Sequence, residues 1–207
     1  MRFIDAKQFW NERFNKPEFI FGKYPNEYLV EQASKYLKPN SSVLCIADGE
    51  GRNGVWLAKQ GMNVTGFDIS EIALAKAHQF AVDNEVHIQY SLCDTDGFNW
   101  QANSYDAVIA IFIQFADPEM LARIFKQVHQ TLKPGGVFIL QGYTPKQLEY
   151  KTGGPSLIEH LYTEEMIRGL SQEFNVLDLM CYEKKLSEGT KHSGISALLG
   201  MVAQKTM

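Results

Sequence analysis

The sequence predicts an α/β fold built on a seven-stranded mixed sheet: five parallel strands, then a C-terminal antiparallel hairpin, with helices on both faces. Two observations carry this prediction. From residue 41 onward, short apolar runs alternate with stretches of helical periodicity, the pattern of parallel strands joined by crossover helices. The last two apolar runs are joined by residues 187–194, which leave no room for a crossover helix, so these strands should pair antiparallel.

The strands are predicted from these apolar runs and from the turn signals between them. The run at residues 105–113 is apolar almost throughout, as expected of a buried central strand. All seven strands are expected at residues 42–47, 63–68, 86–94, 105–113, 137–143, 175–186 and 195–205.

Helices are predicted between the strands, at residues 53–61, at 71–84, from 118 to just before Pro134, and at 163–174. Ser70, Asp117 and Thr163 are expected as N-caps, because their side-chain oxygens can accept from the free N–H groups of a first helical turn. Two further helices, at 6–14 and 26–39, flank an aromatic-rich segment at 15–25. We interpret residues 1–40 as a helical lid or cover segment of a single domain spanning residues 1–207.

Composition argues against several classes of function. With 207 residues and 45% hydrophobic content, the chain can bury one sizeable core. A net charge of −4, without a stripe of Lys and Arg, argues against nucleic-acid or anionic-membrane binding. No apolar run is long enough to span a bilayer, and charges interrupt the first residues where a signal peptide would be apolar. Cys45, Cys93 and Cys181 are odd in number and far apart, which indicates reduced core cysteines. We therefore expect a cytoplasmic monomer or homodimer without a metal.

The stretch at residues 49–54 spells G-x-G-x-x-G after the first predicted strand, and Asp68 follows 19 positions after the first glycine. Glycines at this place let the backbone approach a ligand closely. Asp48 and Glu50 would repel the pyrophosphate of NAD, by on the order of 1 kcal/mol or more per charge pair. S-adenosylmethionine has no phosphate and carries two cationic groups, so it suits an acidic turn. Asp68 can accept from both ribose hydroxyls of either cofactor.

Five segments resemble the class I S-adenosylmethionine-dependent methyltransferases: VLCIADGEGRNG, VTGFDIS, LCDTD, YDAVIAIF and LKPGGVFIL. The resemblance covers roughly residues 24–205. FWNERF, EGRN, Gly153-Gly154-Pro155 and EGTKHSG are similar to the branch of tellurite-resistance and thiopurine-type methyltransferases. The resemblance implies a Rossmann-like fold and S-adenosylmethionine as cofactor, with S-adenosylhomocysteine as product. It also implies a small soft nucleophile as acceptor, a thiol or a selenium or tellurium oxyanion.

The sequence departs from the family pattern at Cys45, where an acidic residue is usual, and at Ala47, where glycine is usual. Asp48 is expected to take over the acidic role. These departures, and the lack of an obvious base, leave open a catalytically idle regulator or partner protein that binds S-adenosylmethionine or S-adenosylhomocysteine. An NAD-dependent reductase is the third and less favoured alternative.

Candidate site residues follow from the strand ends and from the resemblance. Those expected around the cofactor are Asp48, Gly49, Glu50, Gly51, Arg52, Asp68, Ile69, Ser70, Asp94, Thr95, Ile111, Gln114, Trp10 and Arg13. Those expected on the substrate side are Phe21, Tyr24, Gln141, Tyr143 and His192. His192 is the candidate for proton transfer; its alternative is a solvated loop histidine. Asp94 could equally serve a turn, and the N-terminal aromatic side chains could simply pack on the core.

Overall fold

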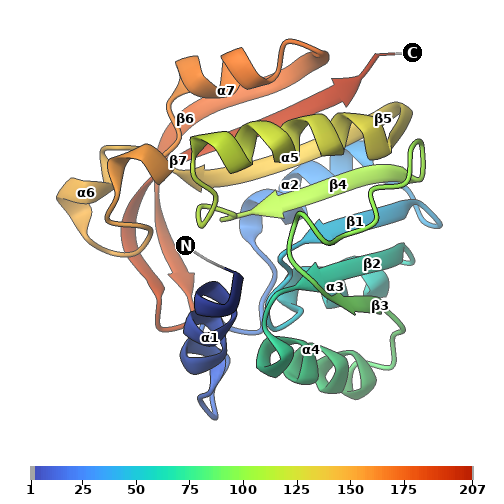
Figure 1. Ribbon diagram of the computed structural model, residues 1–207, viewed down its shortest axis with the longest axis vertical. Helices are drawn as coiled ribbons and strands as arrows, with labels where there is room; N and C mark the ends of the chain where they lie inside the picture. The colour runs from blue at the N-terminus through green and yellow to red at the C-terminus, as the bar shows by residue number, and fades with distance from the viewer. Residues whose placement is uncertain (1–2, 207) are drawn as a thin grey trace.

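One seven-stranded sheet runs through the computed structural model, which describes residues 3–206 (Figure 1). The strand order is β3-β2-β1-β4-β5-β7-β6; the first five strands are parallel, and β7 pairs antiparallel with both β5 and β6. The predicted fold class is therefore confirmed. The strands are β1 (Ser42–Ile46), β2 (Asn63–Asp68), β3 (Gln89–Leu92), β4 (Tyr105–Ile111), β5 (Leu132–Tyr143), β6 (Phe174–Glu188) and β7 (His192–Lys205). Residues 1, 2 and 207, at the ends of the predicted domain and cover segment, lie outside the described residues.

Helices cover both faces of the sheet, with α2, α3 and α4 on one face and α5 and α7 on the other (Figure 1). Ser70, Asp117 and Thr163 accept from the backbone three residues ahead and cap α4, α5 and α7 as predicted. The short α6 and η1 were not predicted. The helices are α1 (Phe3–Phe14), α2 (Glu27–Tyr36), α3 (Arg52–Lys59), α4 (Glu71–Asp83), α5 (Pro118–Thr131), α6 (Gln147–Tyr150) and α7 (Glu164–Leu170), with a 3-10 turn η1 (Ile158–His160). None of the helices described is long and apolar enough to cross a membrane.

The core forms one layer on each face of the sheet. In β1, Leu44 and Ile46 join the layer beneath α5 and α7, whereas Val43 and Cys45 join the layer beneath α2 and α3. This alternation follows from the pleat of a strand with both faces covered. Burial also raises the pKa of the Cys45 thiol, so the residue at the usual acidic position is a neutral core side chain.

The C-terminal hairpin is longer than predicted. The expected loop at residues 187–194 is mostly strand, because β6 runs to Glu188 and β7 starts at His192. Gly189, in the short connection, has a left-handed φ of 64°, which glycine adopts without strain. Glu188 and His192 consequently form the pair that closes the hairpin.

The N-terminal segment lies at the carboxyl ends of the parallel strands, next to the hairpin tip (Figure 1). Trp10 and Phe14 of α1 and Ile20 of the following loop cluster with Ala73 of α4. Ser70 Oγ also donates to Asn11 Oδ1 over 2.7 Å. These contacts bring α1 close to the turn between β1 and α3, which the sequence marks as the ligand-binding turn.

Candidate active site

The turn between β1 and α3 has a backbone that side chains rarely adopt, since Ala47, Gly49 and Gly51 have φ values of 48°, 57° and 87°. Gly49 N donates to Asp68 Oδ2 over 2.9 Å, and Ser70 N donates to Asp68 Oδ1 over 2.9 Å. Asp68 thus ties the glycine turn to the start of α4. Burial raises the pKa of Asp68 to about 6, while the backbone hydrogen bonds limit the rise. Each oxygen of Asp68 keeps a lone pair with which it can accept from a ribose hydroxyl.

Asp48 points beneath the glycine turn into the protein. Tyr90 Oη donates to Asp48 Oδ2 over 2.9 Å, and Gly54 N donates to Asp48 Oδ1 over 3.2 Å. A Cβ on Gly54 would come within 2.4 Å of Asp48 Oδ2, so the third glycine of the pattern makes room for this carboxylate. Burial raises the pKa of Asp48 to about 7, against the effect of its two hydrogen bonds. Both carboxylate oxygens are thus engaged by protein groups.

Glu50 is buried and paired as well. Its Oε1 lies 2.7 Å from Lys76 Nζ, and its Oε2 accepts from Ile20 N over 2.9 Å. Glu50 therefore fastens the N-terminal segment to the glycine turn and to α4. Asp48 and Glu50 are each satisfied by partners inside the protein. Their charges therefore do not distinguish a ligand with a phosphate from one with a sulfonium, although the sequence suggested that they would.

The ends of β2 and β3 carry Ile69, Ser70, Asp94 and Thr95. Ser70 caps α4. Asp94 Oδ1 accepts from Gly97 N over 2.7 Å. This hydrogen bond belongs to a turn, which is the alternative role that the sequence left open for Asp94. Thr95 is buried, and its carbonyl accepts from the indole of Trp100. The second oxygen of Asp94 forms no hydrogen bond with the residues described and can still accept a ligand N–H.

Gln114, expected beside the cofactor, uses its side chain within the protein. Its Nε2 donates to the carbonyls of Tyr143 and His160 over 2.9 and 2.7 Å. Its Oε1 accepts from Tyr143 N over 2.6 Å. Gln114 therefore joins the end of β5 to η1. Ile111, by contrast, is half-buried at the end of β4.

Three aromatic rings surround His192. The ring of Phe112 lies 4.4 Å from it, that of Phe21 4.7 Å and that of Tyr143 5.6 Å, between centroids. Phe112, which sequence reasoning missed, has a left-handed φ of 58°, a strained value for an aromatic residue. Burial lowers the pKa of His192, and its hydrogen bond to Glu188 opposes the shift only in part.

The N-terminal candidates divide into two groups. The guanidinium carbon of Arg13 lies 5.6 Å from the ring centroid of Trp10, which stacks on Phe14. Arg13 Nε is buried with no hydrogen-bond partner among the residues described, and burial lowers the pKa of Arg13. Phe21 reaches His192, whereas Tyr24 is 87% exposed and lies outside this cluster.

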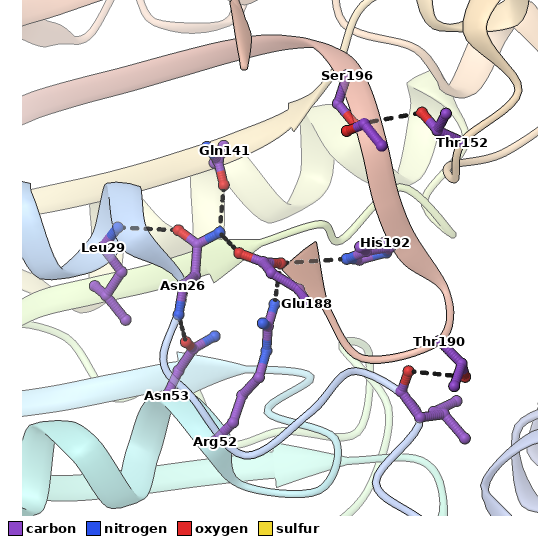
Figure 2. Close-up of polar contacts among 12 residues, drawn as sticks. Asn26, Leu29, Arg52, Asn53, Gln141, Thr152, Glu188, Thr190, His192 and Ser196 are labelled. Carbon is purple, nitrogen blue, oxygen red and sulfur yellow. Dashed lines mark hydrogen bonds and ion pairs between the residues drawn. The ribbon is translucent and has the colours of Figure 1, made fainter. Parts of the chain in front are cut away.

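A buried polar network links the hairpin tip to α3 and to the start of α2 (Figure 2). Glu188 Oε1 accepts from Asn26 Nδ2 over 2.9 Å. Glu188 Oε2 accepts from Arg52 Nη2 over 2.9 Å and lies 3.4 Å from His192 Nδ1. Asn26 Nδ2 also donates to Gln141 Oε1 over 2.7 Å. The network therefore connects two predicted substrate-side residues, His192 and Gln141, with Arg52, which was expected to face the cofactor.

Sequence reasoning missed Asn26 and Glu188, the two residues at the centre of this network. The available signal was the EGTKHSG motif, in which Glu188 and His192 are four residues apart. A groove of about 300 Å³ between α2 and β6 is lined in part by Asn26, Gln141 and Glu188. Within residues 3–206, no three His, Cys, Asp or Glu side chains gather as metal ligands would.

Comparison with known proteins points to one kind of domain. Residues 43–136 match the family described as Methyltransferase domain. The chain is 31% identical to the ribosomal protein L11 methyltransferase of Dictyoglomus turgidum over 134 residues, 63% of this chain and 42% of the relative. It is 29% identical to the probable S-adenosyl-L-methionine-dependent methyltransferase TehB of Haemophilus influenzae over 125 residues, 58% of this chain and 43% of TehB. Each match thus spans less than half the length of the relative.

Solved structures share the fold. The crystal structure of TehB from Haemophilus influenzae has a TM-score of 0.70 at 18% identity and covers 97% of this chain and 67% of that chain. The magnesium protoporphyrin IX methyltransferase ChlM of Synechocystis PCC 6803, solved with bound SAH, has a TM-score of 0.71 at 16% identity and covers 99% of both chains.

Residues 43–136 match a methyltransferase domain, and the fold and the glycine turn with Asp68 resemble those of the class I S-adenosylmethionine-dependent methyltransferases. Within that class it resembles TehB, to which it is similar in both sequence and fold. The predicted resemblance to this class is thereby confirmed, and it supports S-adenosylmethionine as the cofactor.

Proposed function

We propose that the protein transfers the methyl group of S-adenosylmethionine to a small molecule whose reacting atom is a soft nucleophile. One observation carries this proposal: the strained glycine turn, with Asp68 beside it, is joined through Arg52 and Glu188 to the aromatic cluster around His192. The similarity to TehB supports a small acceptor such as a thiol or a selenium or tellurium oxyanion.

The residues at the turn fit this cofactor. Gly49 and Gly51 hold the turn in left-handed conformations that side chains rarely adopt, and Asp68 has lone pairs for the ribose. Arg13 Nε is a buried donor that finds no acceptor among the residues described, which suits the cofactor carboxylate, and Trp10 next to it suits a cation. The remaining residues proposed around the cofactor are Ile69, Ser70, Asp94, Thr95 and Ile111. When bound, S-adenosylmethionine supplies a methyl group already activated by its sulfonium.

On the acceptor side, we propose that Phe21, Tyr143 and His192 surround the nucleophile. Their aromatic faces exclude water from the reacting atom, and the neutral imidazole of His192 can accept its proton. Gln141 supports this side through Asn26. Tyr24 faces solvent, so the proposal does not depend on it.

We further propose that residues 1–40 act as the cover of this single domain. The support is that α1 packs on α4 and that Ile20 N bonds to Glu50, beside the glycine turn. Closing such a segment over a bound cofactor would exclude water from the transfer.

Cofactor binding is tested by calorimetry with S-adenosylmethionine, S-adenosylhomocysteine and NAD. We expect the first two to bind and NAD to fail; binding of NAD alone would overturn the proposal. Methyl transfer is then followed over a panel of thiols, selenite and tellurite. Binding without turnover over the whole panel would favour the catalytically idle alternative.

His192→Gln separates proton transfer from binding. We expect turnover to fall by about a hundredfold or more while cofactor affinity stays within about twofold, because removing a general base typically costs 10²–10⁴-fold and the ring lies on the acceptor side. Unchanged turnover on a true acceptor would remove His192 from the chemistry.

A further inference from the structure

Glu188 is the residue on which three separate segments of the chain converge. It is 8% exposed. It accepts from Asn26 before α2, from Arg52 at the start of α3 and from His192 across the hairpin (Figure 2). Arg52 is buried beside it, so the pair is shielded from solvent.

These donors keep Glu188 ionised. Burial alone would raise its pKa, but the hydrogen bond with His192 and the charge and hydrogen bond of Arg52 outweigh burial and hold the pKa below its ordinary value. An ionised carboxylate only accepts hydrogen bonds. The proton of the neutral imidazole must therefore sit on Nδ1 of His192, the nitrogen that faces Glu188.

The other ring nitrogen, Nε2, is then an unprotonated acceptor. It forms no hydrogen bond with any residue between 3 and 206. The charged and titratable groups that bear on the ring are Glu188 of β6, Arg52 of α3, Arg13 of α1 and Tyr143 of β5. The two guanidinium groups disfavour an imidazolium, and Glu188 alone favours it.

We propose that Glu188 is the positioning residue of His192, holding the imidazole in the Nδ1–H form so that Nε2 can take a proton from the methyl acceptor. This inference rests on the proposed function. In the step it supports, the X–H proton of the acceptor passes to Nε2 and the electron pair of X forms the new bond to the methyl carbon. The carbon–sulfur bond breaks with its electron pair left on sulfur. The resulting imidazolium is stabilised by Glu188.

The arrangement also selects a class of acceptor. Arg52 is already paired with Glu188, and the ring is enclosed by Phe21, Phe112 and Tyr143. A neutral base enclosed by aromatic rings suits an acceptor that arrives uncharged and protonated, such as a thiol or a selenol. An acceptor that is already an anion gains nothing from His192.

The first test reads the imidazole itself and needs no turnover. Nitrogen NMR of the wild type, with His192→Gln to assign the signals, should give an Nδ1–H imidazole at neutral pH. Glu188→Gln should lose that preference and lower the pKa of His192 further, because Arg13 and Arg52 then act unopposed. An Nε2–H ring in the wild type, or the same spectrum in Glu188→Gln, would overturn the proposal even if no acceptor has been found.

The second test uses turnover with two thiols, one mostly protonated and one mostly ionised at the assay pH. Glu188→Gln should lower kcat for the protonated thiol about tenfold to hundredfold, as for other residues that orient a catalytic group, and lower it much less for the ionised thiol. Equal losses for both thiols would overturn the proposal.

Two further variants guard against a merely structural effect. Glu188→Asp keeps the charge and should recover part of the lost kcat. Glu183→Gln, on the exposed part of the same strand, is the matched control and should behave as wild type. Calorimetric cofactor affinity should stay within about twofold in all three variants. Failure of the wild type to bind S-adenosylmethionine would contradict the proposed function instead. In that case the NMR result alone would decide whether Glu188 positions the imidazole of His192.

Discussion

Gly189, at the tip of the C-terminal hairpin, is expected to decide whether the N-terminal cover stays in place. A Cβ at this residue would come within 2.4 Å of Ile20 O and 2.5 Å of Gly22 N. Both are backbone atoms, so no side-chain rotation can relieve the contact. Gly189→Ala therefore forces the tip and the segment around Ile20 apart by about 1 Å, the shortfall from an ordinary 3.4 Å contact. That movement also breaks the hydrogen bond from Thr190 N to Ile20 O, now 3.0 Å.

The loss of stability expected of Gly189→Ala has two parts. Holding alanine at a φ of 64° costs about 1–2 kcal/mol. Losing the Thr190 hydrogen bond and its surrounding contacts costs about 1–2 kcal/mol more. A total of about 3 kcal/mol corresponds to a fall in Tm of roughly 6–12 °C for a chain of this size.

The chain offers a matched control, Gly135→Ala, which introduces only the cost of holding alanine at a positive φ. Gly135 has a φ of 77°, and no atom of the described residues lies within 4 Å of an added Cβ. Gly135→Ala should therefore cost only about 1–2 kcal/mol, or roughly 2–8 °C in Tm.

The informative assays are hydrogen exchange of residues 15–25 and calorimetric binding of S-adenosylmethionine. We expect Gly189→Ala to speed exchange in this segment and to weaken cofactor binding several-fold, and Gly135→Ala to do neither. Wild-type exchange and affinity in Gly189→Ala would refute the reasoning, because the tip would then not hold the cover. Equal effects of both substitutions would refute it too, since strain alone would explain them.

Three more outcomes are expected. Asp68→Ala should weaken S-adenosylmethionine binding by about 1–3 kcal/mol, or roughly five- to 150-fold in Kd by calorimetry, through loss of two ribose hydrogen bonds; a smaller change contradicts that role. Because the pKa of buried Asp48 rises from 3.8 to about 7, the folded state binds an extra proton between these values, and its contribution to stability falls as pH rises from about 4 to about 7. Asp48→Asn should thus raise the free energy of unfolding in urea by about 4 kcal/mol at pH 8 and by less than half of that at pH 5; an equal gain at both pH values contradicts the raised pKa. Trp10→Ala should weaken cofactor binding several-fold in the same assay, while Phe9→Ala, its exposed neighbour, should not; equal losses would indicate a general effect on α1.

The fold could be predicted because its signals are local. Alternating apolar runs and helix caps each involve only a few neighbouring residues, and the short last connection implied the antiparallel hairpin. The direction of a side chain is set by partners far along the chain. Asp48 is oriented by Tyr90, 42 residues away, and Glu50 by Lys76, 26 residues away. Their residue types predicted negative charge at the turn. Only the fold shows that Tyr90 and Lys76 already pair with these two carboxylates.

The centre of the site escaped prediction for a related reason. A loop drawn over residues 187–194 leaves Glu188 and His192 unpaired, whereas the observed hairpin makes them the closing pair. A difference of two residues at one loop boundary and three at the other thus separates a solvated histidine from a buried carboxylate–imidazole pair. The ends of helices and strands are the least certain part of a sequence-based prediction. Here the ends of β6 and β7 hold the two residues, Glu188 and His192, on which the proposed proton transfer depends.

The cofactor side and the acceptor side meet at a single residue of the cover, Ile20. Ile20 donates its N–H to Glu50, beside the glycine turn, and its carbonyl accepts from Thr190, at the hairpin tip that holds Glu188 and His192. Movement of this segment must therefore disturb both sides together. Gly189→Ala should accordingly weaken cofactor binding and proton transfer in parallel. Glu188→Gln leaves the peptide contacts of Ile20 intact, so it should change proton transfer alone, and the two variants together distinguish closure of the site from its chemistry.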